Sequence, residues 1–264
     1  MLRRHTWEGA RREFQPYRRR SPETTELYRL VYHGRDELKR AWAERFQAEY
    51  GVLRDEVIVT LDEYLNCGLL CHGAARAYCD TCKHSILVAY SCKKRGVCPS
   101  CQAKRAVKFA EHLYEEVLEK VPSRHVVFSI PKRIRAYLRY DRKLNNILFS
   151  AAWGSLQECL GSEAGALGAV LTIQTSGEAL NHNPHLHGIL ADGQFMPDGS
   201  FSRFKQIDLG QITKKFAVKV LSALCKEELL TDEAMSHILS QEHSGMVDTF
   251  APLQLTKAGL ALSD

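Results

Sequence analysis

The sequence predicts an α+β protein, in which a helical leader and a cysteine-rich, ribbon-like domain precede a ferredoxin-like domain with an antiparallel sheet. Three observations predict this. Apolar residues recur at helical spacing before residue 50, and seven of the nine cysteines fall between Cys67 and Cys101. Beyond residue 118 the pattern changes to strand, helix, strand, strand, helix, strand. We therefore divide the chain into a basic helical segment at 1–55, a cysteine-rich domain at 56–117 and an α+β domain at 118–264.

The composition is that of an ordinary globular protein. The chain has 264 residues, of which 45% are hydrophobic and 25% charged, so wholesale disorder is excluded and a real core can form. No apolar run approaches the roughly 18 residues of a membrane span. The start, MLRRHTWEGARR, lacks the apolar core of a signal peptide. We expect a cytoplasmic protein with no membrane partner.

A helix is predicted to begin at Ser21-Pro22-Glu23. This order supplies a capping hydroxyl, a proline at the first helical position and an early acid. Apolar residues continue at helical spacing to about Tyr50. They are Leu27, Leu30, Val31, Leu38, Trp42 and Phe46.

The cysteine-rich stretch at 66–102 has the spacing of a zinc ribbon. Cys79-x2-Cys82, fifteen residues and Cys98-x2-Cys101 would offer two pairs of thiolates to one ion. In a reducing compartment, metal is favoured over disulfides. We predict a structural Zn²⁺ at these four cysteines and hence a zinc-ribbon-like domain. The spare ligands, which could hold a second ion or replace a member of the tetrad, are Cys67, Cys71, Cys92, His72 and His84.

The remaining elements follow in order along the chain. We predict helices at 102–120, 141–160, 207–227 and 231–241, with the first ended by Val121-Pro122. Strands are predicted at 125–130, 169–175 and 185–191, with a short one at 246–250. This is the split arrangement of a ferredoxin-like fold, whose central strands would carry His185 and His187 on one face.

Positive charge is unevenly spread over a chain whose formal net charge is +5. Residues 1–20, 91–110 and 132–143 are each strongly basic. One basic run is usually a solvated surface, but three of them favour a polyanion partner, most simply nucleic acid. The residues assigned to it are Lys93, Lys94, Arg95, Lys104, Arg105, Lys132, Arg133 and Arg135.

The stretch NHNPHLHGIL places two histidines on either side of one leucine. Because side chains alternate along a strand, His185 and His187 would share a face while Leu186 points into the core. Two imidazoles so placed suit a divalent metal, although a pair of exposed polar residues on a half-buried sheet would show the same pattern.

Three segments together resemble a known family. SCKKRGVCPSCQAKR, VPSRHVVFSIP and TIQTSGEALNHNPHLHG are similar to the rolling-circle transposases that carry an N-terminal zinc-binding domain, within the HUH endonuclease group. The similarity runs from about Tyr17 to about Phe250.

The resemblance implies an activity and a second metal. In such enzymes the histidine pair and a third polar residue hold Mg²⁺ or Mn²⁺ at the scissile phosphate of single-stranded DNA, here the ends of a mobile element. A tyrosine then attacks phosphorus to give a 5′-phosphotyrosine link. By this resemblance His185 and His187 are metal ligands. Gln174 is the favoured third ligand, with Glu178 and His182 as rivals.

The sequence departs from the family in its tyrosines. All ten lie at or before Tyr140, whereas the family places the nucleophile after the histidine pair, so no catalytic tyrosine is assigned. We expect a truncated transposase. Two alternatives stay open: a non-enzymatic, zinc-dependent DNA-binding remnant or competitor, and a metal-assisted hydrolase in which water replaces tyrosine. Whether the chain is an enzyme, and its oligomeric state, are left open.

Overall fold

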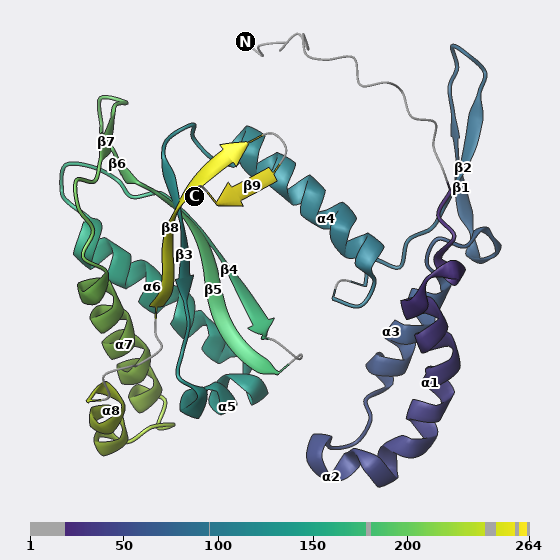
Figure 1. Ribbon diagram of the computed structural model, residues 1–264, viewed down its shortest axis with the longest axis horizontal. Coiled ribbons are helices and arrows are strands. Elements are labelled where there is room, and N and C mark those ends of the chain that lie inside the picture. Colours follow the sequence, from purple (N-terminus) through teal and green to yellow (C-terminus); the bar gives the residue numbers. More distant parts are fainter. Residues whose placement is uncertain (1–18, 95, 178–180, 241–246, 257–258, 263–264) are drawn as a thin grey trace. The chain divides into compact units, whose positions relative to one another are not determined.

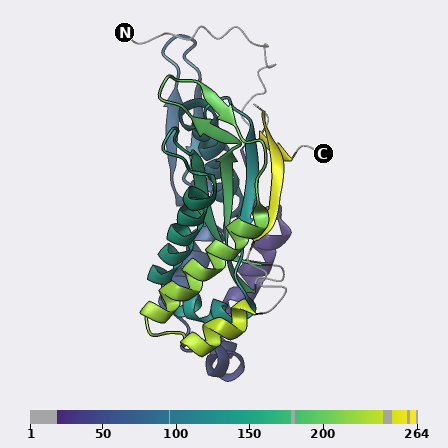
Figure 2. The same cartoon turned by 90° about the vertical axis from the view of Figure 1, so that its left-hand side faces the viewer.

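The computed structural model describes residues 19–94, 96–177 and 181–240, together with the backbone of 247–256 and 259–262. The chain forms two compact units, Met1–Ala110 and Glu111–Asp264, which are described separately (Figures 1 and 2). The division into three segments at 55/56 and 117/118 stays a prediction. None of the helices in the described part of the chain combines the length and apolar character needed to cross a bilayer.

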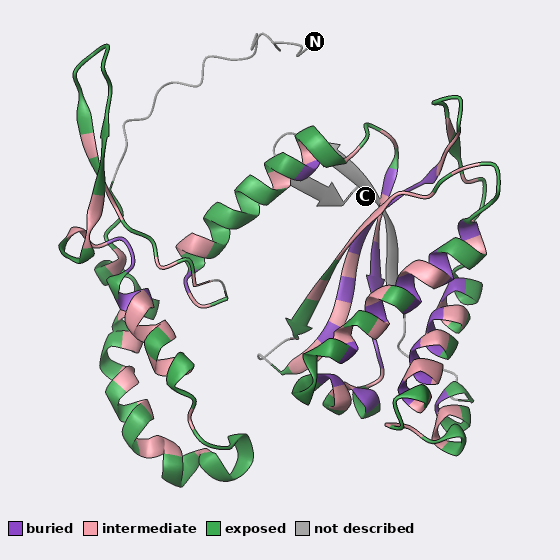
Figure 3. Cartoon of the chain, turned by 180° about the vertical axis from the view of Figure 1, so that it is seen from behind, coloured by how far each residue is buried: buried purple, intermediate pink, exposed green. Residues whose placement is uncertain are grey.

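The first unit begins with helices. They are η1 (Pro22–Thr24), α1 (Glu26–Arg45), α2 (Gln47–Tyr50) and α3 (Asp55–Asn66). Helix α1 starts at Thr25, whose hydroxyl accepts the backbone N–H of Tyr28 and so caps the first turn. The predicted helix over 21–50 is confirmed, with a break at Phe46, whereas α3 was not predicted. Helix α1 buries no residue, and Figure 3 shows it in exposed and intermediate colours along its length.

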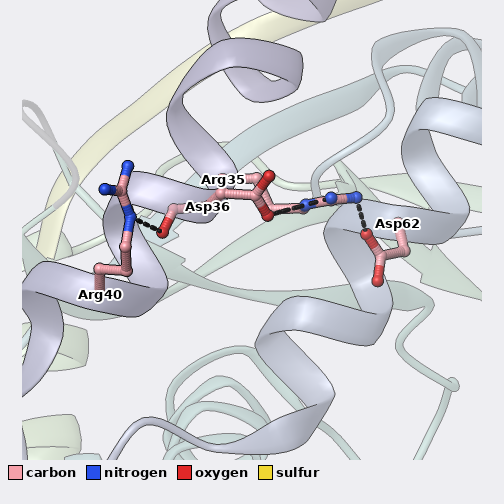
Figure 4. Close-up of polar contacts among 4 residues, drawn as sticks. All are labelled: Arg35, Asp36, Arg40 and Asp62. Carbon is pink, nitrogen blue, oxygen red and sulfur yellow. Dashed lines mark hydrogen bonds and ion pairs between the residues drawn. The ribbon is translucent and has the colours of Figure 1, made fainter.

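Ion pairs add to a small apolar contact between α1 and α3. Arg35 of α1 pairs with Asp62 of α3 and also reaches Asp36 at 3.0 Å (Figure 4). Arg40 donates from Nε to the carbonyl of Asp36 at 3.4 Å. Exposed pairs of this kind contribute at most about 1 kcal/mol each. These ion pairs are therefore a minor part of what holds the two helices together.

The cysteine-rich stretch contains more regular structure than the sequence predicts. After η2 (Leu70–His72), strands β1 (Ala74–Tyr78) and β2 (Ser85–Ala89) form an antiparallel hairpin. Helix α4 (Pro99–His112) follows, three residues earlier than predicted, and continues as one π-helical stretch, η3 (Leu113–Val117).

The first unit has a small core built around cysteines. Among its described residues, the buried hydrophobic cluster consists of Tyr64, Leu65, Cys67 and Cys98. So few buried side chains cannot offset the conformational entropy of ordering this many residues. The unit therefore depends on whatever its cysteines bind.

The second unit is built on a five-stranded sheet. Its strands are β3 (Ser123–Phe128), β4 (Ala169–Ser176), β5 (His182–Ala191), β8 (Val247–Thr256) and β9 (Gly259–Leu262). The spatial order is β4-β5-β3-β8-β9, and all neighbours pair antiparallel. The first four strands have the order of a ferredoxin-like sheet, so the predicted α+β fold with an antiparallel sheet is confirmed. Strand β9 is an addition at the edge next to β8.

Helices cover one face of this sheet. They are α5 (Lys132–Tyr140), η4 (Arg142–Leu144), α6 (Asn145–Leu160), α7 (Leu209–Lys226) and α8 (Asp232–Leu239). Figures 1 and 2 both show α6 and α7 side by side, and these two helices contribute much of the buried cluster, including Leu156, Phe216 and Leu221. Helix α5 was not predicted, because its sequence was interpreted only as a basic run.

The alternation along the two central strands separates a core face from an opposite face. Val126 and Phe128 of β3, with Leu186 and Leu190 of β5, join the buried cluster under the helices. Residues of the other parity therefore project from the opposite face. That face carries the histidine pair, as the sequence predicts.

Candidate metal centres

Four cysteines of the first unit meet at one point. The ligand atoms of Cys67, Cys92, Cys98 and Cys101 all lie within 4.8 Å of one another. The sulfur of Cys67 lies 3.6 Å from that of Cys101 and 3.7 Å from that of Cys98, and the sulfurs of Cys92 and Cys101 are 3.7 Å apart. A tetrahedron with Zn–S bonds of about 2.3 Å has edges of about 3.8 Å, so the cluster has the size of a Zn(Cys)4 site.

Hydrogen bonds to sulfur hold this cluster in place. The backbone N–H of Cys92 donates to Sγ of Cys67 at 3.3 Å, and that of Lys94 donates to Sγ of Cys92 at 3.5 Å. Arg20 donates to both the carbonyl and the sulfur of Cys67, at 3.2 and 3.4 Å. Such donors stabilise thiolates and orient them toward an ion.

The same contacts shift the acidity of the cluster. Burial raises the pKa of the Cys67 thiol, but the N–H of Cys92 and the Arg20 guanidinium outweigh it and the pKa falls to about 7. Burial raises the pKa of the Cys92 and Cys101 thiols. Of these three thiols, that of Cys67 is therefore the most acidic.

This group differs from the predicted tetrad of Cys79, Cys82, Cys98 and Cys101. Cys98 and Cys101 belong to the cluster, but Cys67 and Cys92 take the other two places. Cys79 and Cys82 lie exposed in the turn between β1 and β2. A strand of five residues spans about 17 Å, so the hairpin carries this pair away from the cluster.

The remaining spare ligands lie outside the cluster. Cys71, His72 and His84 are exposed, and among the described residues none of them joins a group of three potential ligands. Cys67 and Cys92, which the sequence analysis gave as alternatives, are the replacements.

The histidine pair lies on the central strand β5. Leu186 is fully buried, whereas His185 and His187 are half-buried on the opposite face. Their ring centroids are 4.8 Å apart. The predicted placement of the pair around a core leucine is therefore observed.

Each of the two imidazoles uses Nδ1 in a hydrogen bond. Nδ1 of His185 lies 2.7 Å from the carbonyl oxygen of Asn183, so this nitrogen carries the proton and donates it. Nδ1 of His187 lies 3.2 Å from Nε2 of His125 on β3. In both rings the hydrogen bond uses Nδ1 and not Nε2, an arrangement that is usual in histidines that bind metal.

Burial keeps His187 neutral. Its pKa is lowered first by burial and then by the nearby rings of His185 and His125. A neutral imidazole has the free lone pair that a metal requires.

Gln174 lies beside the pair. It is the cross-strand partner of His185 in the β4–β5 ladder, and its Nε2 donates to the carbonyl of Ser176 at 3.0 Å. Its Oε1 is therefore the atom that could bind a cation. Two imidazole nitrogens and an amide oxygen form a donor set that suits Mn²⁺ and, less well, Mg²⁺, which prefers oxygen.

The two rivals of Gln174 differ in position. The pKa of His182 is lowered first by burial and then by the positive charges of Arg139 and Arg135 on α5. Since α5 packs on the core face, His182 belongs on that side rather than with the metal pair. Glu178 lies outside the described residues.

The predicted DNA-binding residues are distributed over both units. Lys93, Lys104, Arg105, Lys132 and Arg133 are exposed. Lys94 instead pairs with Glu63 at 2.9 Å, and Arg135 donates to the carbonyl of Ile130 at 3.1 Å. Arg95 lies outside the described residues. Their contact with DNA stays a prediction.

Sequence reasoning missed His125. It was interpreted only as the start of a strand. The available signal was the alternation of side chains along the strand. Val126 and Phe128 point into the core, so His125 projects from the opposite face, where the histidine pair lies.

Two protein families match this chain. The family described as "Transposase zinc-binding domain" matches residues 38–130, which include the four-cysteine cluster. The family described as "Putative transposase" matches residues 168–252, which include Gln174, His185 and His187.

Two curated proteins are similar over more than half of the chain. "Putative transposase y4qJ" of Sinorhizobium fredii (strain NBRC 101917 / NGR234) is 30% identical over 168 residues, which cover 61% of this chain and 41% of that protein. "Transposase for insertion sequence element IS801" of Pseudomonas savastanoi pv. phaseolicola is 29% identical over 150 residues, covering 56% of this chain and 36% of that protein. The similarity thus spans about two fifths of the length of these relatives.

Among solved structures, a conjugative relaxase TrwC in its metal-bound complex with oriT DNA matches 61% of this chain and 64% of that chain. The sequence identity is 13% and the TM-score is 0.32. A likeness at that level carries no argument about mechanism.

Proposed function

We propose that the chain is a rolling-circle insertion-sequence transposase with a zinc-binding domain, which binds single-stranded DNA at the ends of a mobile element and takes part in metal-dependent cleavage and joining there. The observation that carries the proposal is the histidine pair on β5. Both rings have Nδ1 engaged, and both leave Nε2 available on one face of the sheet.

The first unit supplies the DNA-binding part of this function. We assign its zinc to Cys67, Cys92, Cys98 and Cys101. A closed tetrahedron of four thiolates leaves no position for a substrate, so this ion is structural. Lys104 and Arg105 lie on α4, which begins within the cluster, and the ion thereby fixes their positions for contact with phosphates.

The second unit supplies the site of chemistry. His185, His187 and Gln174 are the residues that would hold Mn²⁺ or Mg²⁺. A bound divalent ion would polarise a phosphoryl oxygen and orient the scissile phosphate. The side chains contribute by presenting ring nitrogens at fixed positions, because the hydrogen bonds at Nδ1 hold the rings.

The proposal assigns no nucleophile. Every tyrosine in this sequence lies at or before Tyr140, whereas the family places its nucleophile after the histidine pair. We expect the proposed binding and cleavage of the element's DNA to take place in the cytoplasm.

Mn²⁺ titration tests the metal site directly. Calorimetry with the purified zinc-loaded protein should show one Mn²⁺ site that His185→Ala abolishes, because one of two imidazole ligands is lost. His182→Ala is the matched control, since it removes a histidine of the same strand that senses α5 instead, and it should leave Mn²⁺ binding intact. Equal Mn²⁺ affinity in His185→Ala would refute the site.

Cleavage is tested with labelled single-stranded DNA from sequence flanking the gene. A covalent protein–DNA band on a denaturing gel would identify a tyrosine of this chain as nucleophile. Metal-dependent nicking without that band indicates water. Binding without nicking supports the alternative of a DNA-binding protein that does not cut.

A further inference from the structure

A third histidine, His125, lies on the same face as the histidine pair. It is not one of the three proposed metal ligands, so its role there is still to be explained. It lies on β3, next to β5, with its Nε2 3.2 Å from Nδ1 of His187. The two rings are parallel to within 6°, with centroids 5.4 Å apart. A centroid separation that exceeds the N···N distance by about two ring radii means that the rings meet edge to edge. The contact is therefore an in-plane hydrogen bond rather than stacking.

The surroundings of His125 make this contact unusual for a structural residue. Its strand neighbours on the same face, Val127 and Ile189, are buried and apolar. Its Nδ1 is buried and has no hydrogen-bond partner among the described residues. An apolar side chain would fill this position without leaving a polar atom unsatisfied, so packing alone does not account for a histidine here.

The shared hydrogen bond has two arrangements, and only one is compatible with a metal. If His125 donates, Nδ1 of His187 accepts, and a neutral His187 then carries its proton on Nε2 and has no lone pair there. If His187 donates from Nδ1, its Nε2 is unprotonated and free to bind a cation. His185 is already fixed in this second form by its bond to the carbonyl of Asn183.

We propose that His125 is a positioning residue of the divalent-metal site: its Nε2 accepts the Nδ1 proton of His187 and thereby keeps Nε2 of His187 available to the cation. His125 does not itself bind the metal. It does for His187 what the carbonyl of Asn183 does for His185. The inference rests on the proposed function for the identity of the site, but the tautomer of His187 can be measured without any metal.

A pair of substitutions separates this role from a packing role. His125→Phe keeps the ring but has no acceptor. His125→Gln can place its amide oxygen where Nε2 stood and accept the same proton. We expect His125→Phe to weaken Mn²⁺ binding by about 10- to 100-fold, the loss typical for residues behind a ligand, and His125→Gln to restore most of it. His84→Gln, an exposed histidine of the first unit, is the control that should change nothing.

The spectroscopic readout is the ¹⁵N chemical shifts of the histidine ring nitrogens, measured by NMR on the zinc-loaded protein without Mn²⁺ or Mg²⁺. His187 should carry its proton on Nδ1 in the wild type and in His125→Gln, and on Nε2 in a substantial fraction of His125→Phe molecules. A wild-type His187 protonated on Nε2 would overturn the proposal and needs no variant that might fold poorly. An unchanged Mn²⁺ affinity and tautomer in His125→Phe would overturn it too. If instead His185→Ala leaves Mn²⁺ binding intact, the proposed metal site fails, whatever the tautomer of His187.

Discussion

At the scale of single residues, two different sets of four cysteines are candidate ligands of the structural zinc. Spacing along the sequence favours Cys79 and Cys82 with Cys98 and Cys101, whereas the structure joins Cys67 and Cys92 to that second pair. The two assignments predict different results when a single cysteine is replaced by serine. Only the substitution of a true ligand should remove the zinc ion.

Cys67→Ser should therefore cost the protein its structural zinc, because three thiolates and a hydroxyl bind the ion more weakly than four thiolates. Zinc content measured by atomic emission should fall from about one ion per chain toward zero, and the first unit should lose its cooperative thermal transition. Cys79→Ser is the matched control and should keep both zinc and transition, since Cys79 lies exposed in the hairpin turn. The reverse pattern would restore the tetrad that the spacing predicts.

The difference between the two tetrads shows where sequence reasoning reaches its limit here. A C-x2-C-x15-C-x2-C pattern shows which cysteines can form local pairs. It does not show whether the residues between the two pairs fold so as to bring the pairs together or to hold them apart. In this protein Ala74–Tyr78 and Ser85–Ala89 pair as a hairpin, which carries Cys79 and Cys82 outward at its turn. Cys67 enters the cluster from the end of α3, and no spacing rule predicts that contact.

The histidines illustrate the opposite case. Alternation along a strand is a local rule, so the sequence predicts that His185 and His187 share a face around the core residue Leu186. His125 comes from a different strand and precedes His187 by 62 residues. Its contact depends on the register between β3 and β5, which a single sequence does not specify.

At the scale of elements, one buried carboxylate ties three strands together. Asp192 follows β5 directly and is 2% exposed. It accepts hydrogen bonds from Arg124 of β3, at 2.6 and 3.2 Å, and from Arg203 of β7 (Phe201–Arg203) at 2.9 Å. Strand β7 pairs with β6 (Gly193–Phe195), so the small hairpin is anchored to the sheet through this residue.

Asp192→Ala should lower the free energy of unfolding of the second unit by about 3 kcal/mol. This is the low end of the range for breaking a buried ion pair, because both arginines can still reach water. Urea denaturation followed by circular dichroism measures the change. Asp198→Ala, in the loop between β6 and β7, should cost less than about 1 kcal/mol because that carboxylate is exposed and, within the described part of the chain, its hydrogen bonds are to Ser200. Equal losses in the two variants would contradict the anchoring role.

The order of the first four sheet strands and of the long helices α6 and α7 was predicted correctly, whereas helix α5 was missed. Strands with clear apolar runs and long amphipathic helices fixed the ferredoxin-like order. Residues 132–140 carry so many positive charges that their two buried positions, Ile134 and Leu138, were not recognised as a helical stripe. The four-residue spacing of this pair was the available signal.

At the scale of the whole molecule, the two units differ in what stabilises them. The first has a small core around four cysteines, and the second has a large apolar core between sheet and helices. Their dependence on zinc should differ accordingly.

Removing zinc with a strong chelator should unfold the first unit and leave the second folded. Hydrogen exchange followed by mass spectrometry should show loss of protection across 55–110, while peptides from β3, β5, α6 and α7 keep theirs. Zinc added back should restore protection in the first unit. Loss of protection in both units would mean that they fold as one cooperative body.

The basic faces predict a strong salt dependence of DNA binding. If about three phosphates are neutralised, a tenfold rise in salt should lower the affinity for single-stranded DNA by about 100-fold. Fluorescence anisotropy with a labelled oligonucleotide gives the slope. Replacing both Lys104 and Arg105 by alanine should reduce that slope, whereas Lys219→Ala should not, because Lys219 pairs with Glu158 across α6 and α7. A flat salt response would remove the argument from charge.

The strand order also has a consequence for synthesis of the protein on the ribosome. Strand β3 is made first but lies in the middle of the sheet, between β5 and β8. Its partner β5 begins at His182, and β8 only at Val247. Until β8 emerges, β3 presents an unpaired edge of backbone N–H and C=O groups, which is a template for pairing with other nascent chains. The central strand that brings His125 to the histidine pair is thus the last to be enclosed, and chaperone capture should be strongest during translation of residues 192–247.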